Sequence, residues 1–286
     1  MRSRLLIAAA LLLALPLGAQ RSDFMRRGEL LLGGGTMNYL GDLNNQRLFS
    51  TPRAGFFGGV RQRLDNRWSL RATFAYGTIA APTDCQPLRN LSFRSRIYEL
   101  AAVAEFDFRP FGPGDTESPW TPYLFGGLGV FRFNPETSYT ASDGTLQWVA
   151  LQPLRTEGQG TPAYPQRKQY ALMQLCMPFG MGVRVRLGKS VSLSAEYGLR
   201  KTWTDYLDDV STTYVGADYL RAEVEDGEMA AMLADRSGEV QEGYVNAAGI
   251  KRGDDSLDDW YGFLNISLGV RLETLFGWMR SKRCER

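Results

Sequence analysis

The sequence predicts an all-β fold: an eight-stranded antiparallel transmembrane β-barrel with long extracellular loops and short periplasmic turns. Three observations predict it, namely segments in which apolar and polar residues alternate, connections that alternate between short and long, and an export signal at the start of the chain. The composition agrees, because 31 glycines and 12% aromatic residues suit a sheet protein with close backbone contacts.

Residues 1–19 have the features of a secretory signal peptide. Arg2 and Arg4 precede an apolar run over 5–15, and small residues ending at Ala19 provide a cleavage site. The apolar run has about eleven residues, whereas a membrane-spanning helix needs about 20. The predicted organisation is therefore a signal peptide over 1–19, a barrel over 20–272 and a basic periplasmic tail over 273–286.

Eight segments show the alternation of a strand that has one apolar and one polar face. In the last of them, Leu264, Ile266 and Leu268 alternate with Asn265 and Ser267. The length of each segment is near or above the nine to eleven residues that a tilted strand needs to cross a bilayer. In chain order the segments cover roughly 28–37, 53–64, 67–77, 95–108, 120–133, 173–187, 191–200 and 260–272.

The lengths of the connections predict the topology. Short links at 65–66 and 188–189, and a turn rich in Pro and Gly at 109–119, alternate with much longer connections. Outer-membrane barrels show this pattern, with short periplasmic turns and longer outward loops. A soluble sandwich or lipocalin-like barrel gives no reason to place every long loop at one end. The long connections are 38–52, 78–94, 134–170 and 202–259.

Charged residues occupy the polar faces of the predicted strands, which face the barrel interior. That interior is just wide enough for side chains to fill. Opposed acids and arginines should pair there, because an unpaired buried charge is costly and a guanidinium can hold a carboxylate with two hydrogen bonds. We expect a plugged lumen; the alternatives are a charged pore or a pair of catalytic carboxylates. The residues are Glu29, Glu99, Glu105, Asp107, Glu196, Arg61, Arg63, Arg71, Arg184, Arg186, Arg200 and Arg271.

The chain contains no histidine, which argues against catalysis. This absence excludes Ser-His-Asp and Cys-His nucleophile systems and zinc sites with histidine ligands. The net charge of +2 excludes a generic binder of polyanions. The sequence therefore predicts a non-enzymatic protein with no cofactor, no metal, no nucleic acid and no small-molecule substrate.

The segment 202–259 is strongly acidic, with fifteen Asp and Glu against four Lys and Arg, a net charge of −11. A short amphipathic helix is predicted within 221–236. Clustered carboxylates beside Ser or Thr can bind Ca²⁺ or Mg²⁺, but the spacing of an EF-hand is lacking, so helix capping and solvation are the preferred explanation. The acidic motif comprises Asp205, Tyr206, Asp208 and Asp209, and a second group is Asp254, Asp255, Asp258 and Asp259.

Three cysteines are an odd number for an exported protein. Cys85 in an outward loop and Cys176 near the outward start of the sixth strand can form a disulfide if their Cα atoms come within ~7 Å. Cys284 lies in the periplasmic tail, either as an idle thiol or in a disulfide with a partner protein. The tail is therefore the predicted partner-binding site, with Arg280, Lys282, Arg283 and Cys284.

Three motifs carry a family resemblance. Residues 33–44 (GGGTMNYLGDLN), 200–211 (RKTWTDYLDDVS) and 258–261 (DDWY) resemble the PorG-type barrels of Bacteroidetes, the DUF6089 family. The resemblance spans the mature chain, and TDYLDDVS is its most specific part. It implies a component of the type IX secretion system in the cell outer membrane. Such a component associates with the periplasmic ring lipoprotein and its partner, and supports secretion and, in gliding organisms, motility. The alternative is a generic small porin or surface adhesin.

Overall fold

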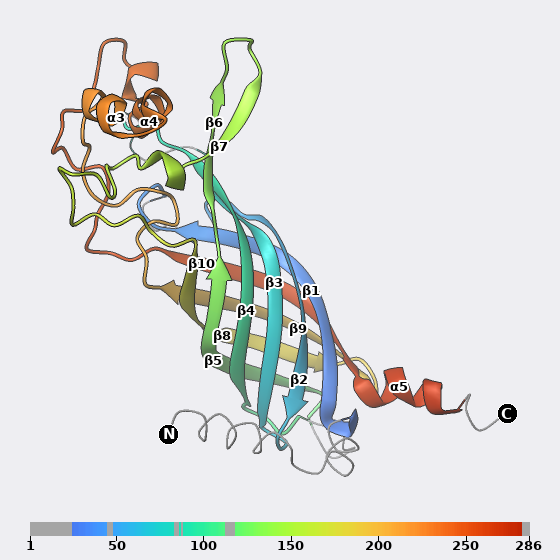
Figure 1. Cartoon of the computed structure of the whole chain (residues 1–286). Helices are drawn as coiled ribbons and strands as arrows, with labels where there is room; N and C mark the ends of the chain where they lie inside the picture. The colour runs from blue at the N-terminus through green and yellow to red at the C-terminus, as the bar shows by residue number, and fades with distance from the viewer. Residues whose placement is uncertain (1–24, 45–47, 83–85, 87, 112–117, 282–286) are drawn as a thin grey trace, which may run out of the picture.

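The structure, a computed structural model, describes residues 25–281 except 45–47, 83–85, 87 and 112–117, and these form a closed antiparallel β-barrel (Figure 1). β1 pairs with β10 and β3 pairs with β4, which closes the sheet. The predicted fold of eight antiparallel barrel strands is confirmed. The barrel strands are β1 (Gly28–Leu40), β2 (Arg53–Arg63), β3 (Trp68–Ala81), β4 (Phe93–Asp107), β5 (Trp120–Arg132), β8 (Met173–Arg186), β9 (Val191–Thr202) and β10 (Trp260–Arg271).

The outer wall of the barrel is apolar. Large apolar side chains on seven of the eight strands are exposed, and Leu128 on β5 is the most exposed of them at 69%. A water-soluble monomer rarely exposes so extended an apolar surface, whereas a barrel that crosses a membrane requires one. The exposed set includes Leu32, Phe56, Leu70, Phe74, Leu100, Leu124, Leu175, Met181, Val183, Leu264, Ile266 and Leu268.

Glycines bring some strands into close contact inside the barrel. A Cβ atom on Gly35 of β1 would lie 1.9 Å from the carbonyl oxygen of Leu264 on β10, and one on Gly33 would lie 2.6 Å from the Phe57 ring. Any other residue at these positions would force the strands apart. Gly33 and Gly35 are therefore positions where the close packing of the barrel requires glycine.

The long connections contain more regular structure than the sequence predicted. The 134–170 connection, expected to be a loop, begins with a hairpin of β6 (Pro135–Thr140) and β7 (Leu146–Ala150), which extends the sheet beyond β4. The helix predicted within 221–236 is divided into α3 (Ala217–Glu223) and α4 (Gly227–Ala234). α3 is followed by Val224, which has an extended backbone, and Gly227 then packs closely against α3, where a Cβ atom would lie 2.6 Å from the Arg221 Cα.

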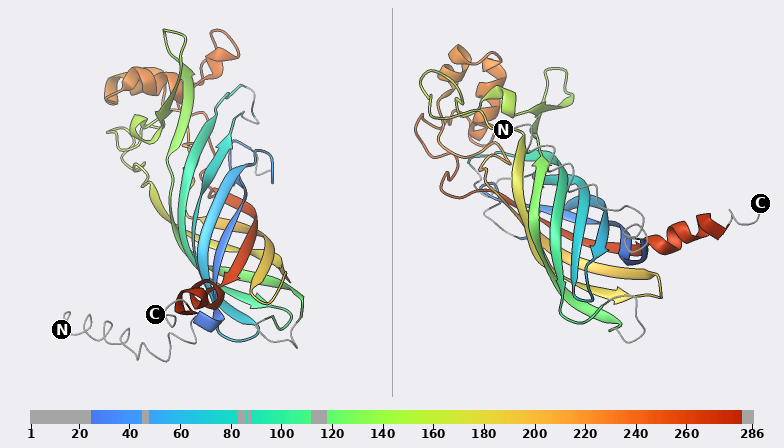
Figure 2. Two further views of the ribbon diagram at one scale, coloured as in Figure 1. Left: turned by 90° about the vertical axis from the view of Figure 1, so that its right-hand side faces the viewer. Right: turned by 60° about the horizontal axis from the view of Figure 1, so that its bottom comes forward.

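All the long connections lie at one end of the barrel, together with α3, α4 and the hairpin, while the short turns and α5 (Leu272–Ser281) lie at the other (Figures 1 and 2). We call these the long-loop end and the short-turn end. Part of the tail predicted over 273–286 is thus helical. Within the described residues, no helix is long and apolar enough to cross a membrane.

A hydrophobic core fills the upper barrel and continues into the loops at the long-loop end. Phe131 of β5 and Tyr261 of β10 are fully buried and in ring contact, with 5.4 Å between their centroids. The same core includes Leu207 and Leu233 from the acidic segment. The loops therefore fold onto the mouth of the barrel, and we call the described residues of 41–52, 82–92, 134–172 and 203–259 the loop cap.

Candidate functional site

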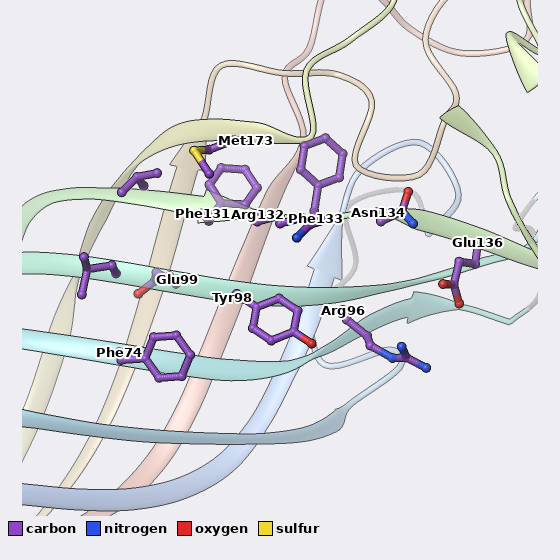
Figure 3. A pocket seen from close by; sticks show the side chains of 12 residues that line it. Phe74, Arg96, Tyr98, Glu99, Phe131, Arg132, Phe133, Asn134, Glu136 and Met173 are labelled. Atoms are coloured by element: carbon purple, nitrogen blue, oxygen red, sulfur yellow. The ribbon is translucent and has the colours of Figure 1, made fainter. Parts of the chain in front are cut away.

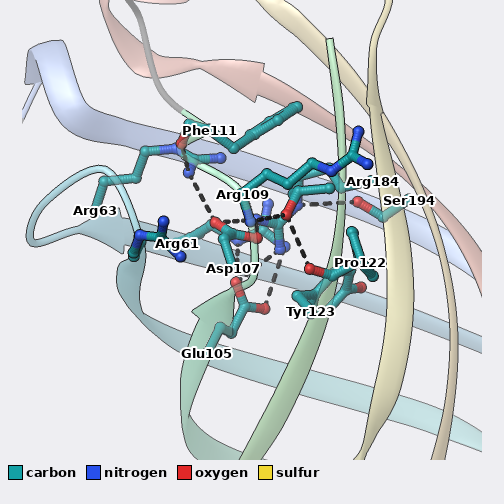
Figure 4. Close-up of polar contacts among 12 residues, drawn as sticks. Arg61, Arg63, Glu105, Asp107, Arg109, Phe111, Pro122, Tyr123, Arg184 and Ser194 are labelled. Carbon is teal, nitrogen blue, oxygen red and sulfur yellow. Dashed lines mark hydrogen bonds and ion pairs between the residues drawn. The ribbon is translucent and has the colours of Figure 1, made fainter. Parts of the chain in front are cut away.

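Charged side chains fill the barrel interior toward the short-turn end. We call this group the lumen cluster, and Figure 4 shows its central part. Every member is buried, with a relative exposure of 6% or less. The cluster contains five carboxylates and five arginines, so its formal charge is zero. Its members are Glu29, Glu99, Glu105, Asp107, Glu196, Arg61, Arg63, Arg71, Arg184 and Arg200.

Glu105 is the centre of the cluster and pairs with arginines from three other strands. Arg61 Nε lies 2.6 Å from Glu105 Oε2, Arg184 Nη2 lies 2.8 Å from the same oxygen, and Arg71 Nε lies 3.1 Å from Oε1. Since burial strips these groups of water, each charge depends on its partners for stabilisation. The carboxylate therefore joins β2, β3 and β8 to β4.

Two further carboxylates complete the network near the short turns. Asp107 accepts two hydrogen bonds from Arg184, of 3.0 and 3.1 Å, and lies 3.3 Å from Arg63. Glu29 pairs with Arg61 at 2.8 Å and with Arg63 at 3.0 Å. The network thus links four strands, β1, β2, β4 and β8.

Two ion pairs lie closer to the long-loop end of the barrel, and the carboxylate of each also accepts a hydrogen bond from a tyrosine. Glu196 accepts hydrogen bonds from Arg71 at 2.7 Å and from Tyr123 at 2.6 Å. Glu99 accepts hydrogen bonds from Arg200 at 2.9 Å and from the Tyr261 hydroxyl at 2.8 Å. All four of these bonds are charge-assisted and cross the lumen.

The lumen cluster leaves little open space. A cavity at the short-turn mouth, lined in part by Glu29, Arg63 and Arg186, has a volume of about 20 Å³, which is room for one water molecule. Arg186 and Arg271, also predicted for the network, lie at this mouth instead of in its centre. Arg186 lies over the Phe111 ring, 5.3 Å from its centroid, and Arg271 is opposite Glu29 in the β1–β10 register.

The acidic motif of 202–259 lies in the loop cap, where its carboxylates hold loops together. The Tyr39 hydroxyl lies 2.5 Å from Asp208 Oδ2 and 3.0 Å from Asp259 Oδ1. The hydroxyl has a single hydrogen, so a protonated carboxyl group would supply the donor for the second contact. Burial raises the pKa of both Asp208 and Asp259, which favours the protonated form of a carboxyl group at this site.

A second cap contact joins two loops that are distant in sequence. Arg252 Nη1 donates to Glu157 Oε1 at 2.9 Å, and Glu157 also accepts the backbone N–H of Ser211 at 2.9 Å. Asp209 accepts hydrogen bonds from Thr156 at 2.5 Å and Tyr170 at 2.7 Å. The contact fixes the 134–170 connection against the acidic segment.

The preference for helix capping and solvation of these aspartates is wrong for the centre of the motif. Asp208 and Asp209 are 1% and 0% exposed, and neither caps α3 or α4. Asp205 is partly buried, and burial raises its pKa to about 9. Tyr206 stacks on Tyr170, with 4.8 Å between ring centroids. The motif therefore lies in the interior of the loop cap.

Sequence analysis did not identify Glu157, Arg252 or Tyr39 as important residues. Glu157 and Arg252 are 95 positions apart and lie outside the alternating segments, so no local pattern signals their contact. Tyr39 lies near the end of β1 but beyond the predicted strand over 28–37, so no pattern signals its two carboxylate neighbours. Among the described residues, no group of three or more Asp, Glu, Cys or His side chains has the arrangement of a metal site.

Most of the residues in the predictions for the cysteines and the tail lie outside the described residues. Cys176 is a free thiol, fully buried, with its Sγ 3.8 Å from the Tyr261 hydroxyl. Its predicted disulfide partner Cys85 lies outside the described residues, as do Lys282, Arg283 and Cys284. Arg280 belongs to α5. The disulfides and the partner-binding role of the tail stay predictions.

Residues 8–147 match the family model of DUF6089, described as a domain of unknown function. No match was found among curated protein sequences.

The chain also resembles solved structures at low sequence identity. Neisserial surface protein A (NspA) is 13% identical with a TM-score of 0.40, covering 85% of this chain and 96% of its own. Ail, the attachment invasion locus protein of Yersinia pestis, is 10% identical with a TM-score of 0.39, and the match covers 85% of this chain and 96% of Ail. The outer membrane protein OprG from Pseudomonas aeruginosa is 10% identical with a TM-score of 0.37, and the match covers 87% of this chain and 99% of OprG. Similarity at this level carries no information about ligands or partners. The chain is a closed eight-stranded barrel whose residues 8–147 are similar to the DUF6089 family.

Proposed function

We propose that this protein is a non-enzymatic barrel of the cell outer membrane that anchors the periplasmic ring lipoprotein of the type IX secretion system. The match to DUF6089 over 8–147 supports this proposal, as does the resemblance of the TDYLDDVS motif to PorG-type barrels. The apolar outer wall supports the membrane location, because exposure of so large an apolar surface to water is unfavourable.

The observation that carries the proposal is the closed lumen. Five carboxylates and five arginines occupy the interior without an excess charge, and the loop cap covers the long-loop end. A protein that conducts solutes needs a continuous aqueous path, whereas an anchor needs only a rigid barrel and an accessible surface. The closed interior thus favours the structural role over the porin.

The short-turn end is the proposed contact with the periplasmic partners. In an outer-membrane barrel the short turns face the periplasm and the long loops face outward. α5 continues from β10 at this end and leads to the basic residues and Cys284. A disulfide between Cys284 and the ring lipoprotein would make the anchor covalent in the oxidising periplasm.

Co-purification from native membranes tests the anchor. Affinity-tagged protein is solubilised from outer membranes, and we expect the ring lipoprotein to co-purify with it. Non-reducing gels of the same envelopes should contain a higher-mass band that disappears with reductant and in Cys284→Ser. A matched control is Cys176→Ser, which should keep the band because Cys176 is buried inside the barrel. If the lipoprotein does not co-purify, the anchoring role is refuted.

A surface-binding role is the second candidate, and the loop cap favours it. A cap held by buried ion pairs presents a fixed outward surface, as a receptor or adhesin requires. Planar-bilayer conductance separates both structural roles from a porin: we expect no steady open channel. Binding of intact cells to host or surface ligands, lost on deletion of the hairpin over 135–150 while the lipoprotein is retained, would favour the adhesin.

A further inference from the structure

A groove with a mixed lining lies on the outer wall of the barrel and not in its lumen. It has a volume of about 600 Å³ and lies across β3, β4, β5 and β8, near the long-loop end (Figure 3). Its outward-facing lining is apolar on one side and carries two arginines on the other. The residues used below are Phe74, Tyr98, Leu100, Met173, Arg96 and Arg132.

Both arginines face outward, and neither pairs with a carboxylate among the residues that the structure describes. Arg96 and Arg132 are exposed, and within the described part of the chain neither has an acidic side chain at ion-pair distance. Glu136, the acidic residue of the groove, pairs instead with Arg94 at 3.1 Å, and Arg94 also lies 3.3 Å from the centroid of the Trp148 ring. The groove therefore has two positive charges available for an anionic ligand.

The strand register places the two arginines close together. Arg132 of β5 is directly opposite Tyr98 of β4, and Arg96 is two residues further along β4 on the same face. Such diagonal neighbours are separated by roughly 7–8 Å at their Cα atoms. Two long guanidinium side chains at this spacing can hold one phosphate between them, and the guanidinium fork matches phosphate geometry.

The groove crosses the boundary between headgroups and hydrocarbon. The Tyr98 and Tyr76 rings are in tilted contact, with 5.0 Å between their centroids, and aromatic residues of this kind mark the interface level on membrane barrels. Leu100 lies on the side of this level toward the barrel middle, and Phe74 is opposite Leu100 in the register. Arg96 lies on the other side. A lipid beside this wall would therefore have its chains on the apolar lining and its headgroup at the arginines.

We propose that this groove is a binding site for a phosphorylated lipid of the outer leaflet, with its phosphate between Arg96 and Arg132 and an acyl chain along Phe74, Leu100 and Met173. Charge complementarity commits the site to an anionic headgroup, and the apolar lining to an acyl chain. The inference rests on the membrane placement proposed above, but not on the secretion partner.

Lipid titration followed by native mass spectrometry tests the site. The full mature protein, folded in a neutral detergent, is titrated with diphosphoryl lipid A and separately with phosphatidylcholine. We expect one lipid A per barrel, bound more tightly than phosphatidylcholine. Arg96→Gln with Arg132→Gln should weaken lipid A binding about 30-fold, since each basic residue near a membrane surface contributes about fivefold. Equal affinity of wild type and double variant would overturn the proposal.

A matched pair of substitutions controls for charge. Arg67 and Arg109 are exposed at the short-turn end, so Arg67→Gln with Arg109→Gln removes the same charge from the opposite rim and should leave lipid A affinity unchanged. Met173→Trp fills the apolar side and should weaken binding with both arginines present. An equal loss in the control pair would indicate nonspecific attraction and overturn the proposal.

Two further measurements separate other occupants from a lipid. Inorganic phosphate should not displace lipid A, because it lacks an acyl chain; displacement would identify a free-phosphate site instead. A photo-crosslinker at position 98 in cells should give an adduct of lipid mass, and a protein-sized adduct would overturn the lipid assignment. If wild-type protein fails to insert into vesicles, the membrane placement is refuted; insertion without lipid selectivity refutes the groove alone.

Discussion

Removal of one cation from the lumen cluster should destabilise the barrel more than any surface change. Arg184 has no exposed surface and donates hydrogen bonds to Glu105 at 2.8 Å and to Asp107 at 3.0 and 3.1 Å. Arg184→Met keeps much of the side-chain length but leaves two carboxylates short of a partner and the cluster with a net charge of −1. Loss of one partner from a buried ion pair costs about 3–5 kcal/mol.

The magnitude depends on charge balance, which a second substitution can restore. Asp107→Asn in the Arg184→Met background returns the cluster to neutrality while Glu105 keeps Arg61 and Arg71. We therefore expect the double variant to be more stable than the sum of the single changes, by a coupling of about 0.5–3 kcal/mol. Lys189→Met, in the exposed turn between β8 and β9, is the matched control and should change stability little.

Reversible urea unfolding in liposomes measures these differences. Tryptophan fluorescence reports the transition, and the shift between folded and heat-denatured bands on a gel confirms that each variant forms a barrel. If Arg184→Met unfolds at the wild-type urea concentration, or if Asp107→Asn adds its full cost to it, the charges are not coupled and the reasoning is refuted.

Three other perturbations give distinct expected results. Leu268→Arg places a charge on the outer wall and should cost roughly 2–4 kcal/mol in liposomes, so equal urea midpoints for variant and wild type would contradict the assigned faces. Gly35→Ala should destabilise by about 1–3 kcal/mol through contact with β10, whereas Gly188→Ala, with nothing within 4 Å, should not; urea midpoints compare them. Raising the pH should loosen the loop cap, because burial raises the folded-state pKa of Asp205 from 3.8 to about 9. The folded cap holds the protonated form of Asp205, so its stability is fully present below about pH 4 and falls as the pH rises to about 9. Hydrogen exchange of 204–211 measures the loosening, and a flat profile would contradict it.

Barrel architecture could be predicted because alternation is a local signal. Leu264, Ile266 and Leu268 alternate with Asn265 and Ser267, and a strand presents these two sets to opposite faces. The same alternation shows which residues of a strand point inward, so the members of the lumen cluster could be identified from the sequence. The individual pairs were not, because Arg184 and Glu105 come together only through the barrel register.

The loop cap could not be predicted for a different reason. Arg252 and Glu157 make a buried contact across 95 positions, and no periodicity relates two loops that fold against each other. Asp209 adopts a left-handed backbone with φ of 68°, which an acidic loop sequence does not signal. Composition alone therefore favoured solvated aspartates, whereas the fold buries them.

The contacts of the loop cap have a consequence for engineering the long-loop end of the barrel. Arg89 donates to the backbone oxygens of Asp42 and Arg252, so three connections share one side chain and none can be exchanged alone without disturbing the others. The tip of the β6–β7 hairpin is different: a Cβ atom on Gly144 would meet nothing within 4 Å. A foreign peptide for surface display would be best inserted at that tip, where its graft would leave the interlocked connections intact.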